Sequence, residues 1–238
     1  MKNKLAILVF SAVFMNIISC ILIKNKMSYV EFCQKDYLIV TSLYYYKFTV
    51  LPSVIILNLN AAKQELNINR VIRYGSMKKV YGHIIAQMLR SSVIAAVITI
   101  ISIMLVSACI CRLPADNWKM EKSYAFYKYG ANVVEYQYYK LIIAEVFSYV
   151  YTAYILSCVS VLVMRISKRS IISCCIVVLI IVMEYGKFPQ KLLLYYGIIY
   201  NSVYIVSFNL GHMMIVCGCI SLMASIVINI MGHGDFLE

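Results

Sequence analysis

The feature that most constrains this chain is the repetition of long apolar runs that contain no charged residue. Leu5 to Ile23, Ser91 to Cys111 and Val146 to Met164 are runs of this kind, and forty uncharged residues follow Lys191. A helix rises about 1.5 Å per residue, so about 20 residues cross the hydrocarbon core of a bilayer. The chain is therefore predicted to be an all-α integral membrane protein.

Length and charge together divide the sequence into six predicted spans. They are Leu5 to Ile23, Thr41 to Ala62, Ile84 to Cys111, Leu141 to Met164, Ser170 to Tyr185 and Leu210 to Met231. Six spans put both termini on one side, and the short basic segments favour the inside for them. No loop exceeds about thirty residues, which is too few for a separate core, so residues 1–238 are predicted to form one transmembrane domain.

The first run also resembles a secretory signal peptide, because two lysines precede it. Residues 21–23 continue the apolar run past the point where a cleavage site would turn polar. This continuation favours an uncleaved span.

Residues 192–208 form an apolar stretch of only seventeen residues, interrupted by Gly197 and preceded by Gly186 and Pro189. These residues break helices, and a stretch of this length is short for a span. A re-entrant or interfacial hairpin on the outer side keeps the six-span topology, and a seventh span is the alternative.

The formal net charge of +12 would indicate nucleic-acid binding in a soluble protein. Here the basic residues cluster at the ends of the apolar runs, so they are predicted to set topology and contact lipid headgroups, with no nucleic-acid partner. Most of the nine cysteines lie inside apolar runs without a CxxC pair, and their odd number argues against a disulfide framework.

No set of residues with recognisable catalytic spacing is present. The acidic residues are scattered, the three histidines share no ligand spacing, and no GxxxxGK[ST] loop occurs. The sequence therefore predicts no catalytic residue, no cofactor and no metal site, and any nucleotide must be hydrolysed by another chain.

The outer loop from Arg112 to Lys140 is rich in tyrosine and contains Trp118. Aromatic rings with one polar edge prefer the membrane interface, so an aromatic belt is predicted. Binding of an amphipathic ligand is the alternative role for this loop.

Three charged residues are candidates for polar groups inside the membrane. Lys47 and Arg90 lie about two turns inside the second and third predicted spans, and Glu145 lies near the start of the fourth. A charge at the bilayer centre costs at least about 2.5 kcal/mol, but long side chains near span ends reach back to water. Snorkelling is therefore the favoured interpretation for Lys47 and Arg90, and the lining of a transport path, with Glu145 as a partner, is the alternative.

The segment from Lys63 to Lys79 lies between the second and third predicted spans. At 100° per residue, one face of a helix over Lys63 to Ser76 is apolar and the opposite face carries Arg70 and Arg73. Gly75 would end this helix in a left-handed cap, and the lysines after it would anchor the next span. A surface helix that only fixes topology and a helix that transmits motion both fit these residues.

This segment resembles one in the permease subunits of bacterial ABC-2 type transporters, where an arginine, a small residue and paired basic residues precede the third span. The residues that carry the resemblance are Arg70, Arg73, Tyr74, Gly75, Ser76, Lys78 and Lys79. Six spans, inside termini and an outer hairpin before the last span are similar as well. The long tyrosine-rich outer loop departs from the family pattern.

The resemblance implies a subunit of an ATP-driven exporter in the bacterial plasma membrane. It implies a separate ATPase that contacts the segment from Arg70 to Lys79, a second permease, and peptide, bacteriocin or drug-like substrates. A membrane sensor, immunity protein or assembly protein that transports nothing is the alternative.

Overall fold

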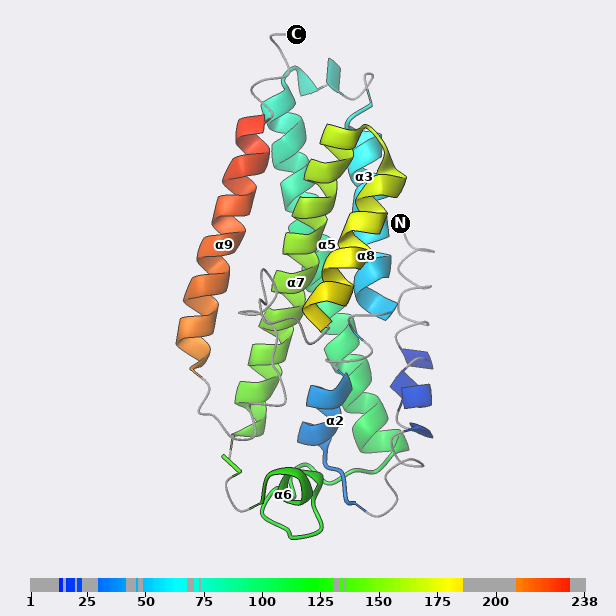
Figure 1. Ribbon diagram of the computed structural model, residues 1–238, viewed down its shortest axis with the longest axis vertical. Coiled ribbons are helices and arrows are strands. Elements are labelled where there is room, and N and C mark those ends of the chain that lie inside the picture. The colour runs from blue at the N-terminus through cyan, green and yellow to red at the C-terminus, as the bar shows by residue number, and fades with distance from the viewer. Residues whose placement is uncertain are drawn as a thin grey trace. The chain divides into compact units, whose positions relative to one another are not determined.

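The computed structural model describes residues 13–14, 16–19, 21–22, 30–41, 46, 49–67, 71–72, 74–130, 133–134, 136–185 and 209–231. Within these ranges the regular elements are helices, and the β contact is an isolated bridge between Glu31 and Ser123. The helices are α2 (Gln34–Thr41), α3 (Leu51–Glu65), α5 (Met77–Leu105) with the π-helical turn η2 (Val106–Ile110), α6 (Tyr124–Tyr129), α7 (Tyr138–Ser167), α8 (Ser170–Tyr185) and α9 (Leu210–Met231) (Figure 1).

Three of these helical stretches are long and apolar enough to cross a membrane. They are Met77–Ile110, with 34 residues, Tyr138–Ser167, with 30, and Leu210–Ile230, with 21. The helix α8 is apolar but has only 16 residues. The prediction of a helical chain with membrane-spanning segments is confirmed to this extent.

The predicted spans agree with the helices to different degrees. The fifth and sixth coincide with α8 and α9, the fourth lies within Tyr138–Ser167, and the third overlaps Met77–Ile110 and ends one residue beyond it. The second span, predicted from Thr41, overlaps α3, which begins at Leu51. The first span falls mostly outside the described residues, and the predicted hairpin at 192–208 falls entirely outside them.

The chain divides into two compact units. Unit 1 comprises residues 1–50, 95–149 and 198–211, and unit 2 comprises residues 51–94, 150–197 and 212–238. The long helices α5 and α7 each contribute residues to both units.

Helix α7 is the most buried element of unit 2. Its residues from Tyr151 to Cys158 are all buried. The hydroxyls of Tyr154 and Ser225 share a hydrogen bond of 2.6 Å that joins α7 to α9, and Ser173 of α8 donates to the Ser160 carbonyl of α7 at 2.5 Å. In Figure 1 this part of α7 lies between α8 and α9.

Unit 1 contains a group of side chains around Asp36, which we call the Asp36 cluster: the buried Cys33, Lys35, Asp36 and Trp118, and the exposed Asp116. Asp36 is fully buried and accepts hydrogen bonds from the Trp118 indole (2.9 Å) and from the Cys33 backbone amide (3.1 Å) and thiol (3.2 Å). Lys35 forms an ion pair with Asp116, and its Nζ lies 5.0 Å from the centroid of the Trp118 ring. The cluster therefore fixes α2 to the loop that follows η2.

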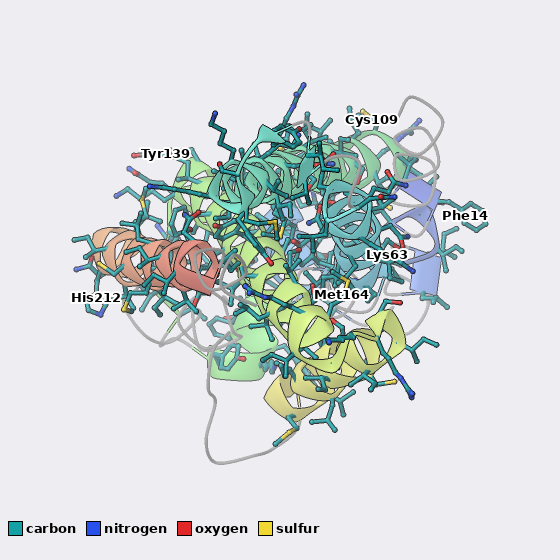
Figure 2. The ribbon with its side chains drawn as sticks, turned by 90° about the horizontal axis from the view of Figure 1, so that it is seen from above. Phe14, Lys63, Cys109, Tyr139, Met164 and His212 are labelled. Carbon is teal, nitrogen blue, oxygen red and sulfur yellow. The ribbon has the colours of Figure 1, made fainter. Side chains whose placement is uncertain are left out.

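Large apolar side chains cover the outer faces of several helices. On α9, Ile215, Leu222, Ile226 and Ile230 are each more than half exposed. Figure 2 shows the side chains of Phe14 and His212 pointing away from the ribbon. Exposed apolar faces of this extent are unusual for a protein surrounded by water and are ordinary for helices that face lipid.

Candidate functional site

The coupling segment, which we define as residues 63–79, begins inside α3 and ends inside α5. Lys63 lies on the exposed side of the last turn of α3, which runs to Glu65. The Leu66 amide donates to the Ala62 carbonyl at 2.9 Å, and the chain then turns at residues 66–67. The expectation of one continuous helix from Lys63 to Ser76 is therefore corrected. The helical periodicity of apolar and basic residues continues through this turn, so the sequence does not reveal where α3 ends.

Gly75 ends a short helical stretch that includes residues 71–72 and 74. Its φ of +70° is the left-handed conformation that glycine adopts without the penalty of a Cβ atom. Its amide lies 3.2 Å from the carbonyl oxygens of both Val71 and Ile72. The prediction of a left-handed cap at Gly75 is confirmed. Arg70 and Arg73 lie outside the described residues.

Helix α5 begins at Met77, seven residues before the predicted third span, and Ser76 directly precedes it. Its Oγ accepts a hydrogen bond from the Lys79 amide at 3.4 Å, which satisfies one of the free amides of the first turn. Lys78 and Lys79 are exposed in this turn, where positive charge opposes the helix dipole. These lysines therefore lower the stability of the first turn of α5.

Aromatic packing holds the segment against the start of α5. The ring of Tyr74 lies 5.6 Å from the ring of His83, measured between centroids. Ile72, on the predicted apolar face, has 74% of its surface exposed. The segment thus presents an apolar side chain and basic side chains next to a fixed turn.

Arg90 is exposed on α5, next to Leu89, whereas Met88 and Ser92 on the opposite side of the helix are buried. It forms no ion pair within the described residues. Arg165 of α7 stacks on the ring of Tyr81 at 5.4 Å, and Arg90 lies nine residues, or about 13 Å, further along α5. Arg90 therefore lies on the exposed side of α5 in unit 2, and both snorkelling and the lining of a transport path stay predictions for it.

Of the other two candidate intramembrane charges, the structure describes only Glu145. Glu145 of α7 is fully buried in unit 1. Lys47 lies outside the described residues, so the predicted pairing of these two side chains stays a prediction.

Most of the buried hydroxyls on α5 bond to the backbone of their own helix. Ser92 donates to the Met88 carbonyl at 2.8 Å, and Thr99 donates to the Ala95 carbonyl at 2.7 Å. Such bonds satisfy a hydroxyl in an apolar environment without a partner from another helix. These residues therefore give no sign of a polar transport path.

Asn58 is a buried polar residue that the sequence pattern did not single out. It is 3% exposed in α3, and its amide bonds to Ser91 of α5 and to Ser157 of α7. The available signal was an amide side chain within a largely apolar run, because such groups need a partner when they are buried.

Cys111 takes part in a disulfide, which corrects the view of this residue as a small apolar one. It directly follows η2, at the end of the first long apolar stretch. Cys33 is a free thiol, and burial together with the nearby Asp36 carboxylate raises its pKa to about 12. Cys33 is therefore protonated and unreactive at neutral pH.

The described residues contain no group of His, Cys, Asp and Glu side chains placed to hold a metal ion. Comparisons with protein families, with curated proteins and with solved structures found no match to this chain.

Proposed function

We propose that this chain is the membrane-spanning subunit of an ATP-driven exporter of the ABC-2 type, acting with a separate ATPase and a second permease. The observation that carries the proposal is the local structure of the coupling segment. A left-handed turn at Gly75 and a capped start at Ser76 connect two helices, with Ile72, Lys78 and Lys79 exposed. An ATPase docked on this segment would push directly on α3 and α5.

The disulfide at Cys111 supports the orientation that this function needs. Disulfides persist in oxidising compartments, outside the cytoplasm. The two ends of a membrane-spanning helix lie on opposite sides, so Met77 would be cytoplasmic if Ile110 is outside. The coupling segment would then face the compartment that contains ATP.

The rest of the proposal extends the sequence pattern. It includes six spans in the bacterial plasma membrane, both termini inside and an outer hairpin at 192–208. Peptide, bacteriocin or drug-like substrates follow from the family resemblance alone. In the alternative, a sensor, immunity or assembly protein, the basic segment would only set topology.

Cysteine labelling in intact cells tests the orientation. We expect an impermeant maleimide to label Lys122→Cys from outside and to label Asn67→Cys only after the membrane is opened, because both positions are exposed and they lie beyond opposite ends of α5. Cys33 should not interfere, because it is buried with a pKa of about 12. The chain without an added cysteine measures the signal from the other native thiols. Labelling of both positions from outside would contradict the topology.

Capture of the partner tests the function itself. The unmodified chain, purified in mild detergent from its native host, is expected to bring down a protein with a P-loop, identified by mass spectrometry. A chain that is fully inserted and yet captures no P-loop protein would overturn the proposal and favour the sensor, immunity or assembly alternative.

A further inference from the structure

One side chain in unit 2 holds three helices to one another. The amide nitrogen of Asn58, in α3, donates to the Ser157 hydroxyl of α7 at 2.8 Å. The amide oxygen of Asn58 accepts a hydrogen bond from the Ser91 hydroxyl of α5 at 2.5 Å. Asn58 is 3% exposed and Ser157 is fully buried, so the bond between them lies in the packed interior of the unit, and the bond to Ser91 is partly buried.

We call Asn58 and its bonds to Ser91 and Ser157 the junction. The junction is important because of where Asn58 lies relative to the coupling segment. Asn58 lies seven residues before Glu65, the last residue of α3, and Ser91 lies on α5, the helix that leaves the coupling segment. The junction therefore links both helices that flank the segment, and it links them to α7. Through α7 it is connected to α8 and α9, by the bonds of Ser173 and Tyr154.

Breaking this junction leaves the buried amide of Asn58 to find new partners, whereas the Ser91 and Ser157 hydroxyls keep their bonds to the Met88 and Ala153 carbonyls. The relative positions of α3, α5 and α7 are therefore constrained at this depth, whereas contacts between apolar side chains permit sliding. We propose that Asn58 is the positioning residue that makes these three helices move together when the coupling segment is displaced. This inference rests on the proposed function, because the displacement is the one that the ATPase would impose.

The first test measures the junction in the chain alone. Spin labels at Ile56→Cys on α3 and Ile166→Cys on α7, both exposed positions, report the distance between these helices in lipid nanodiscs. The distance distribution is expected to be narrow with Asn58 in place and to broaden or split with Asn58→Leu, which has similar volume and no amide. If the width of the distance distribution were unchanged in Asn58→Leu, the proposal that Asn58 holds α3 and α7 together would be wrong.

Neighbouring hydroxyls provide matched controls for the loss of a buried polar group. Ser91→Ala and Ser157→Ala each remove one bond to Asn58 and should broaden the distribution partly. Ser92→Ala removes a hydroxyl bonded to its own helix and should leave the width unchanged. Equal broadening in Ser92→Ala and Ser91→Ala would show that hydroxyl loss, and not the junction, is responsible.

The second test uses the P-loop protein captured by the unmodified chain. Asn58→Leu is expected to capture it normally, because the coupling segment is unchanged, while stimulation of ATP hydrolysis by the chain falls about fivefold or more, within the usual range of coupling between sites. A purely structural role would instead reduce capture and stimulation together. Stimulation at the level of the unmodified chain would overturn the positioning role.

The two levels of failure are distinguishable. If the unmodified chain captures no P-loop protein, the proposed function fails, and the coupling role of Asn58 fails with it. A broadened distance distribution would then show only that Asn58 joins the helices. If capture succeeds and Asn58→Leu stays fully coupled, the proposed function stands and this inference alone is wrong.

Discussion

Reversal of Arg70 and Arg73 together, as Arg70→Glu with Arg73→Glu, is expected to abolish capture of the ATPase. The two residues lie three apart in the sequence, so one helical face would present both to an acidic groove. Removing one partner of a buried charge pair at an interface costs about 2 to 5 kcal/mol. Each 1.4 kcal/mol of lost binding free energy weakens affinity about tenfold. The loss of two charge pairs, together with the two repulsions that replace them, therefore corresponds to at least about a thousandfold loss of affinity for the ATPase.

A second double reversal controls for charge alone. Lys168 and Arg169 are exposed in the turn between α7 and α8, on the same predicted side of the membrane. Lys168→Glu with Arg169→Glu changes the net charge equally but leaves the coupling segment intact, so capture should continue. Membrane insertion of both variants is checked by the labelling described above. Equal loss of capture in both would assign the effect to general charge and contradict specific docking on the coupling segment.

Replacement of Asp36 by alanine is expected to have the largest effect on stability. The carboxylate accepts from the Trp118 indole and from the backbone amide and thiol of Cys33, and it is fully buried. Each buried donor that loses its acceptor costs about 1 to 3 kcal/mol, so we expect a loss of about 3 kcal/mol in the free energy of unfolding.

The chain contains its own reporter for this experiment. Its single tryptophan is Trp118, which donates to Asp36, so intrinsic fluorescence during thermal unfolding reads the Asp36 cluster directly. Asp36→Asn keeps an acceptor oxygen for the indole and should unfold at an intermediate temperature. Glu121→Ala removes an exposed carboxylate in the same loop and should be nearly neutral. An Asp36→Ala midpoint equal to that of the unmodified chain would contradict the structural role of the cluster.

The sequence alone determined where the apolar helices near the C-terminus run. The predicted fifth and sixth spans coincide with α8 and α9, because the length of an uncharged run and the local hydrogen bonding of a helix are both properties of consecutive residues. The left-handed conformation at Gly75 was predictable for the same reason, since a glycine at the end of an amphipathic pattern ends a helix locally.

Only the tertiary structure decided which polar side chains form hydrogen bonds with one another. Asp36 and Trp118 are 82 residues apart, and Asn58 and Ser157 are 99 apart, so no local pattern links either pair. Periodicity also placed Lys63 on a new helix, whereas it belongs to the last turn of α3. Hydropathy records how apolar a residue's neighbours in sequence are. The partner of a buried amide or carboxylate is set by how distant helices pack, which no single run encodes.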